Sequence, residues 1–375
     1  MECVKYEWKK FVSFRFFWLL CMIVFTFNLW NLSENVKMSW PSAEAVKELY
    51  ADLNRQPKEE QGRWLQTLGE NELMPYTGNP YTEEELYDKI LREFVQIGQY
   101  ESYLEDIEQK SVNMSSAIFS DENSFAYRNA QRTPAAFEKL HGLELSADVS
   151  DGVIFATQAE FTDICMIFLL TAMVYFLVMY EKHLYRLLKS TYKGRKYVIR
   201  AKLLTAAGIT CFLVLLLYGG NYLFSAYKCG FGNLERPIQS VTAMYESPCM
   251  LSVGEYLIFY LLLKMLVCYV IALVMIWLAQ KMSSSAGAVL VIGFIGIAEY
   301  LLYLLLPSVS YMDVLKYVNL AEYIKVYPLL SKYHNLDVFA YPVNAMQIFF
   351  VVLPVCLLLL LAVNVWKFCR CDKVK

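Results

Sequence analysis

The segment from Glu181 to Lys202 is the most basic part of this 375-residue sequence. Its first half has helical order, because basic residues recur at steps of four and three while leucines occupy another side. A turn at Lys193 to Arg195, around Gly194, is expected to end this helix. The pattern predicts a cationic amphipathic helix whose simplest chemistry is electrostatic adhesion to anionic lipid. The basic residues on its face are Lys182, Arg186, Lys189 and Lys193.

Two charged side chains lie well inside long apolar runs, away from the ends, where a charge is costly. Lys264 lies in one run and Glu299 lies in the next run along the chain. Because consecutive runs are antiparallel, the two side chains are expected at a similar depth. We predict that Lys264 and Glu299 form a buried ion pair that fixes the packing of the two helices. A place along a substrate path is the alternative role for both residues.

The sequence lacks the motifs of several enzyme classes. No Gly-x-x-x-x-Gly-Lys-[Ser/Thr] occurs, so the chain has no such loop to surround a phosphate with backbone amides. Neither a Gly-x-Ser-x-Gly elbow nor a His-Glu-x-x-His motif is present. The histidines, His141, His183 and His334, fall in separate segments, which disfavours a zinc site. We therefore expect no catalytic residue, no metal and no cofactor, and no nucleic-acid partner.

Two cysteines differ from the others because they share one polar segment. Most of the 10 cysteines lie in apolar runs and are expected to be small packing residues. Cys229 and Cys249 instead lie between two such runs. A disulfide between them and a pair of free thiols are both compatible with the sequence.

The composition of the chain indicates membrane-spanning helices, because 57% of the residues are hydrophobic and only 19% are charged. These helices must position the charged side chains and cysteines described above. Six apolar runs are long enough to cross a bilayer of about 30 Å. The first lies within residues 1–32 and is expected to be an uncleaved span rather than a signal peptide. We predict an all-α integral membrane protein with six transmembrane helices. The other five runs are 161–180, 203–224, 256–279, 286–306 and 344–366.

Residues 33–160 form the only long polar region of the sequence. Its composition favours helices, with starts expected near Ser42 and Thr82 because acidic residues follow each of them. A strand-like return is expected at Gly152 to Thr157. We predict a mostly helical domain, followed by a five-helix remainder of the transmembrane domain at 161–375.

The distribution of positive charge predicts the orientation. The N-terminus, residues 181–202 and the C-terminal tail are all basic. Basic loops remain on the cytoplasmic side of a membrane. We therefore expect a multi-pass protein of the cell membrane with both termini in the cytoplasm and residues 33–160 outside.

The loop from Glu181 resembles the first cytoplasmic loop of ABC-2 type permeases, the membrane subunits of bacterial ABC exporters. The similar features are Glu181, a leucine-rich helix, Ser190-Thr191, Gly194-Arg195 and an apolar run entered through Ala201-Lys202-Leu203-Leu204. The six-span order matches too, and the segments Pro237–Ser240 and Tyr333–Phe339 resemble outside-loop patterns of a branch with a large domain between spans one and two.

The resemblance implies a permease that moves a substrate with ATP hydrolysed by a separate subunit. Its expected partners are a cytosolic ATP-binding subunit, a second permease copy or homologue, and membrane lipid. The implied coupling loop contains Glu181, Arg186, Lys189, Gly194, Arg195 and Lys196, and Arg195 and Lys196 are the best candidates for the docking contact. The alternative function is a membrane-anchored receptor or assembly protein whose outer domain binds a ligand.

Overall fold

The computed structural model describes residues 2–39, 42–70, 80–115, 121–181, 192–282 and 325–370. The described chain is mainly helical, which confirms that part of the prediction. Five helical segments are long and apolar enough to cross a membrane, and these are the helices expected of a multi-pass membrane protein. The predicted span at 286–306 lies outside the described residues. The five segments are Arg15–Lys37, Asp151–Met179, Arg195–Lys228, Val253–Lys281 and Ala345–Cys369.

The first apolar run is divided between two helices. Helix α1 (Glu2–Val12) is amphipathic, and helix α2 (Arg15–Lys37) is the long apolar one. The chain bends between them at Ser13 and Phe14, and the rings of Phe11 and Phe17 pack across the bend with centroids 4.7 Å apart. The apolar run predicted to begin at Phe11 therefore becomes a spanning helix only from Arg15.

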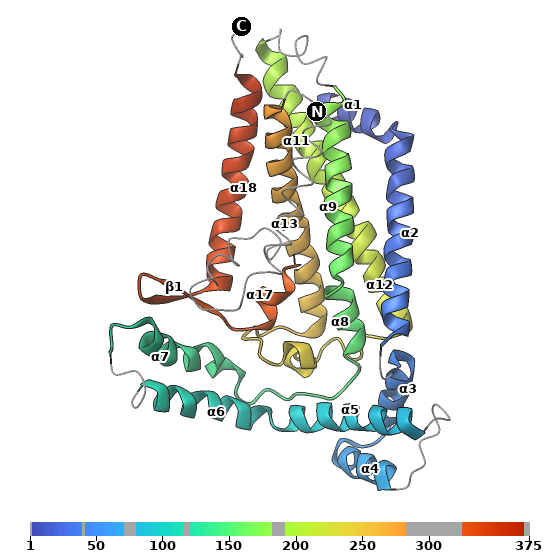
Figure 1. The fold of residues 1–375 in the computed structure, drawn as a ribbon, viewed down its shortest axis with the longest axis vertical. Coiled ribbons are helices and arrows are strands. Elements are labelled where there is room, and N and C mark those ends of the chain that lie inside the picture. Colours follow the sequence, from blue (N-terminus) through green and yellow to red (C-terminus); the bar gives the residue numbers. More distant parts are fainter. Residues whose placement is uncertain are drawn as a thin grey trace.

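Helix α13 (Val253–Lys281) lies at the centre of the bundle, in contact with α9, α11 and α18 (Figure 1). Helix α2 packs beside α9 and α12 at one side. Buried apolar side chains from α2, α9, α11, α13 and α18 form one continuous core. The bounds are α8 Asp151–Thr157, α9 Glu160–Val174, η3 Tyr175–Met179, α11 Tyr192–Val214, η5 Leu215–Gly219, α12 Gly220–Lys228 and α18 Ala345–Cys369; η3 and η5 are π-helical turns.

The strand predicted at Gly152 to Thr157 is wrong, because these residues form helix α8. Val153 and Ala156 are buried at helical spacing, so an apolar run with two small residues is packed here as a helix. Gly152 is required by a close approach, since a Cβ at this position would lie 1.8 Å from the carbonyl oxygen of Gly230. Helix α8 can therefore lie against the end of α12.

The helix break predicted at Lys193 to Arg195 is also wrong, because α11 begins at Tyr192 and continues through Gly194. Glycine keeps its backbone N–H and costs a helix only about 0.5–1 kcal/mol relative to alanine, so a single glycine does not end a helix. Gly194 therefore lies within the basic first turn of a helix that continues into the bundle.

The polar region lies at one end of the bundle, and we call this end the polar end. Figure 1 shows α5 and α6 following one another across the direction of the long helices. A first core joins α3, α4 and α5, and a second joins α6, α7 and Tyr245. The bounds are α3 Ala43–Leu53, α4 Lys58–Glu70, α5 Pro80–Gly98, α6 Tyr100–Asn113, α7 Phe125–Phe137 and η2 Glu138–Leu140.

A β-hairpin precedes the last long helix and was not predicted. Strands β1 (Asn335–Val338) and β2 (Tyr341–Asn344) pair antiparallel, with Val338 opposite Tyr341. The two residues of the turn, Phe339 and Ala340, have φ values of 53° and 63°. Left-handed backbone costs a non-glycine residue about 1–2 kcal/mol. Tight hairpin turns usually contain Asn or Gly, so this turn lacks the usual signal. A short helix, α17 (Tyr327–Ser331), precedes the hairpin.

Candidate functional site: a charged junction at the base of the basic loop

Four charged side chains meet where the basic loop leaves the bundle, and we call them the charged junction: Glu7, Lys10, Glu181 and Lys202. The Lys10 Nζ lies 2.7 Å from one oxygen of Glu181, and the Lys202 Nζ lies 2.6 Å from the other. Glu7 pairs with both lysines and lies 3.3 Å from Lys202. The junction therefore joins α1, the start of the basic loop and α11 through alternating charges.

Helical spacing accounts for two members of the junction, Glu7 and Lys10, which lie on neighbouring positions of α1. Glu7 and Phe11 are four residues apart on the buried face of the amphipathic helix α1, and Lys10 follows Glu7 by three. Glu181 follows the π-helical turn η3 after one residue, Tyr180. Lys202 is fully buried in α11, and its Nζ also donates to the Leu177 carbonyl oxygen at 2.8 Å. Every ammonium group in the junction therefore has acceptors.

The junction is electrically neutral, and its charges stabilise one another against burial. Burial raises the pKa of Glu181, but the charges of Lys202 and Lys10 outweigh this effect and hold the pKa below its ordinary value. Burial lowers the pKa of Lys10, but hydrogen bonds to Glu181 and Glu7 outweigh burial and hold this pKa above its ordinary value. Loss of one partner from a buried pair costs about 3–5 kcal/mol, because a charge is left uncompensated. The junction therefore ties Glu181 to both α1 and α11 through ion pairs that are costly to break.

The other predicted residues of the loop are only partly described. Arg186 and Lys189 lie outside the described residues. Gly194, Arg195 and Lys196 fall in the first turns of α11, where Arg195 is half-buried and Lys196 is exposed. Arg195 precedes Lys202 by seven residues, which is about 10 Å along a helix. A contact on Arg195 or Lys196 would therefore act on the charged junction through one rigid helix.

Lys264 has a described partner that the sequence analysis missed. Its Nζ lies 2.6 Å from the carboxylate of Asp163 on α9, and Tyr218 on η5 donates a hydrogen bond to the same carboxylate. The ring centroids of Tyr218 and Tyr260 lie 4.7 Å and 5.3 Å from the Lys264 Nζ. Glu299, the predicted partner, lies outside the described residues. Asp163 was detectable as an acid just inside an apolar run.

A second buried polar group joins three helices without charge. The Asn28 amide donates to Asn221 at 2.7 Å, Asn221 donates to the Thr162 hydroxyl at 2.8 Å, and Thr162 donates to Asn28 at 2.8 Å. All three side chains are buried. This closed triangle gives each of these side-chain nitrogen and oxygen atoms a hydrogen-bond partner and joins α2, α9 and α12. Single polar residues on separate helices carry no spacing signal, so the sequence analysis did not find it.

The disulfide considered for Cys229 and Cys249 is absent, since both are free thiols. Cys229 is buried in a small cluster with Val36 and Ala43. Cys249 packs instead against the bundle core, with its sulfur 3.8 Å from that of Met346. The two thiols belong to different packing clusters. Of the two alternatives that the sequence left open, a disulfide and a pair of free thiols, the structure has the free thiols.

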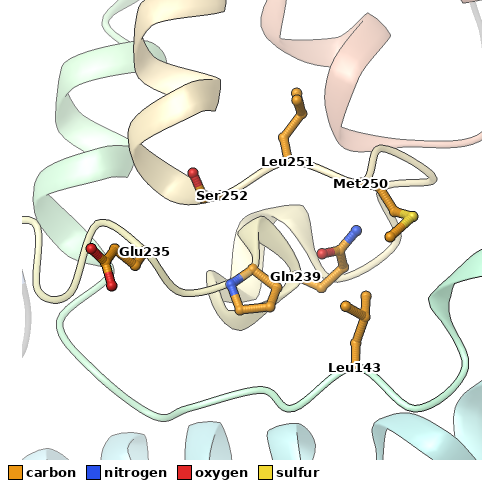
Figure 2. A pocket seen from close by; sticks show the side chains of 7 residues that line it. Leu143, Glu235, Gln239, Met250, Leu251 and Ser252 are labelled. Atoms are coloured by element: carbon orange, nitrogen blue, oxygen red, sulfur yellow. The ribbon is translucent and has the colours of Figure 1, made fainter.

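A small cavity lies at the polar end, opposite the charged junction. Its volume is about 180 Å³, and Figure 2 shows Leu143, Met250 and Gln239 around it. The Gln239 amide nitrogen donates to the carbonyl oxygens of Ser247 and Cys249, so it is occupied by the loop itself. The volume is below the roughly 300–1,000 Å³ of typical small-molecule sites. We therefore place the candidate site at the junction and not in this cavity.

Within the described ranges, no group of three or more His, Cys, Asp or Glu side chains is arranged to hold a metal ion. Comparison with protein-family models, with curated protein sequences and with solved structures gives no match.

Proposed function

We propose that this protein is the membrane-spanning subunit of an ABC exporter, powered by ATP hydrolysed on a separate polypeptide. The observation that carries the proposal is the charged junction, which connects the base of the basic loop to α1 and α11. A loop that receives a mechanical push needs a stiff connection to the helices that must move. The sequence resemblance of this loop to the ATPase-coupling loop of ABC-2 permeases supports the same assignment.

The proposed orientation has α1 and the basic loop on the cytoplasmic side and residues 33–160 outside. In its support, α1 and the C-terminal end of α18 lie at one end of the bundle and α3 to α7 lie at the other (Figure 1). Basic residues also mark the former end, including Lys9, Lys196 and Lys367. The proposed topology has six membrane spans in all, and residues 286–306 form the fifth.

In the proposed mechanism, two permease copies each receive an ATPase subunit on the basic loop. Closure of the ATPases on nucleotide presses on the loop and on the first turn of α11 at Arg195 and Lys196. The junction passes this displacement from Glu181 to α1 through Lys10 and to α11 through Lys202. The helices then change between inward-open and outward-open arrangements.

Affinity purification of the tagged protein from mildly solubilised native membranes, followed by mass spectrometry, tests the proposal. We expect recovery of a cytosolic ATPase with a phosphate-binding loop, and its loss from the double variant R195E/K196E. The matched control is K367E/R370E, which makes the same change of charge at the same end of the bundle and should retain the ATPase.

Two outcomes contradict the proposal. An intact wild-type protein that brings down no ATPase would favour the alternative, a membrane-anchored receptor or assembly protein. An ATPase that remains bound to R195E/K196E would refute the docking role of the first turn of α11. Membrane insertion of each variant is checked by protease protection of the polar region.

A further inference from the structure

The β1–β2 hairpin holds an aromatic side chain fully outward at its tip. Phe339 is 95% exposed, and Val338 and Tyr341 beside it are exposed as well. Both turn residues, Phe339 and Ala340, have left-handed backbone that their side chains disfavour. An exposed apolar cluster on a strained turn indicates a contact surface and not a packing element.

The hairpin is continuous with a long apolar helix, and this fixes its position. The Asn344 side chain accepts hydrogen bonds from the Met346 and Gln347 amides, so it caps α18 at the residue where β2 ends. Strands of four residues extend about 13 Å. Figure 1 shows the hairpin projecting sideways beyond α18, across the direction of the long helices. The tip therefore lies at the level where α18 enters the bilayer.

Helix α7 holds the hairpin in this orientation through two arginines. The Arg128 Nη1 donates to the Ala340 carbonyl at 3.3 Å, and the Arg132 Nη1 donates to the Pro342 carbonyl at 2.8 Å. The Arg128 guanidinium also lies 4.2 Å from the centroid of the Tyr341 ring. The tip is therefore rigidly presented, with two positive charges directly beside it.

We propose that the β1–β2 hairpin is an interfacial membrane anchor that inserts Phe339 among phospholipid acyl chains while Arg128 and Arg132 face the lipid phosphates. Phenylalanine supplies the apolar insertion, and Tyr341 has the amphipathic ring that is favoured at the headgroup level. The one acid within the hairpin, Asp337, accepts the Ala340 amide at 2.7 Å and is occupied by the turn.

The outer face of α18 identifies lipid as the occupant. Its side chains Val351, Val355, Leu358 and Leu359 are exposed, and in a spanning helix such a face lies in hydrocarbon. The hairpin projects beyond this same helix (Figure 1). The anchor would hold α7, and the polar region with it, at a fixed height above the bilayer. The inference depends on α18 spanning a membrane and is independent of the transport function.

Fluorine NMR of the full-length protein in nanodiscs of phosphatidylcholine and phosphatidylglycerol tests the anchor. Trifluoromethyl-phenylalanine is placed at residue 339, at residue 16 on the exposed face of α2, or at residue 112 on α6. Relaxation is measured with lipids that carry a nitroxide on the acyl chain and, separately, with a water-soluble gadolinium chelate. The probe at residue 16 is the lipid control, and the probe at residue 112 is the water control.

We expect the acyl-chain nitroxide to relax the probe at residue 339 as it relaxes the probe at residue 16. A nitroxide on the part of the acyl chain near the headgroup should relax the probe at 339 more strongly than a nitroxide near the end of the chain. Its relaxation by the gadolinium chelate should be several-fold weaker than at residue 112. Strong relaxation by the chelate would overturn the proposal by placing the tip in water. Protection from both agents would overturn it by showing that a protein surface, such as a second copy, covers Phe339.

Discussion

Lys264 on α13 and Asp163 on α9 form an ion pair 2.6 Å long inside the helical bundle, and the side chain of Lys264 is completely buried. Tyr218 donates a further hydrogen bond to the Asp163 carboxylate, so the carboxylate has partners from two other helices. The pair therefore joins the central helix to its neighbours where water is scarce.

Removal of one charge from this pair is expected to destabilise the bundle. Lys264→Met should lower the free energy of unfolding by about 3–5 kcal/mol, because Asp163 loses its buried cation. The double variant K264M/D163L should be less destabilised than the sum of the single changes. Unfolding in mixed micelles, followed by circular dichroism, measures both quantities. Strict additivity would show that the two side chains are not coupled.

The charged junction predicts that the lysines at this end of the bundle contribute unequally to the free energy of unfolding. Lys202 is 1% exposed and Lys10 is 16% exposed. Lys202→Met should therefore cost about 3 kcal/mol or more, and Lys10→Met clearly less. Lys9→Met is the control, because this exposed neighbour should change stability by less than about 0.5 kcal/mol. Equal effects at Lys202 and Lys9 in the same unfolding assay would contradict a buried junction.

Glu93 predicts a stability that falls as the pH rises. Burial raises the pKa of this carboxyl above its ordinary 4.5, outweighing the hydrogen bond from Tyr50 and the charge of Lys89. A raised pKa means that the folded state binds the proton more tightly than the unfolded state. This stabilisation is complete below pH 4.5 and is lost as the pH rises through the folded pKa.

Glu93→Gln should therefore flatten the pH dependence of the melting temperature above pH 4.5, because the amide resembles the protonated acid. Thermal melts of wild type and variant from pH 4.5 to pH 8 measure the difference. Glu122→Gln, an exposed acid, serves as the control and should leave the slope unchanged. A wild-type slope that persists in E93Q would show that another group is responsible.

His141 predicts a second pH dependence in the polar region. Its Nδ1 lies 2.6 Å from a carboxylate oxygen of Glu101, and this hydrogen bond raises the pKa of His141 above 6.5. The stabilising interaction is present below pH 6.5 and is lost as the pH rises through the folded pKa. NMR of protein with labelled histidine, assigned with the variant H141Q, should give a pKa above 6.5. In the variant Glu101→Gln this pKa should fall, and an unchanged value would refute the pairing.

The hairpin turn predicts that glycine at residue 340 stabilises the folded protein. Ala340→Gly relieves a strain of about 1–2 kcal/mol, and the greater freedom of glycine in the unfolded chain returns about 0.4–1 kcal/mol. A net gain of roughly 0.5–1 kcal/mol is expected from these two terms. The double variant F339N/A340G should share this gain in detergent and lose part of it in lipid, because the anchor is gone. Melting temperatures in both media test this, and equal gains of the two variants in lipid would contradict it.

The long helices could be predicted from the sequence because an apolar run of sufficient length has one stable arrangement in a bilayer. Five predicted runs coincide with long apolar helices, and the helical nature of residues 80–113 also followed from the composition of the polar region. Short segments were harder. Gly152–Thr157 has a strand-like composition, but packing against α12 and continuity with α9 make it helical.

The polar contacts could be predicted only in part. Lys264 was identified as a buried charge, but its described partner Asp163 was overlooked at the edge of its run. Glu181 was singled out for its place in the loop, whereas its contacts with Lys10 and Lys202 depend on how three segments fold together. The sequence spacing of such partners carries no information, because the chain returns to the same point after long connections.

The charged junction also sets an order for biosynthesis. Glu7 and Lys202 are 195 residues apart, so the first helix is made long before its partners. At ordinary rates of translation the ribosome needs roughly 10 to 40 s to cover this distance. During that interval α1 must wait at the membrane surface with its charges hydrated, and it can dock only after α11 has been inserted. Helix α1 is thus synthesised well before α11 but reaches its native place only after α11 has been made.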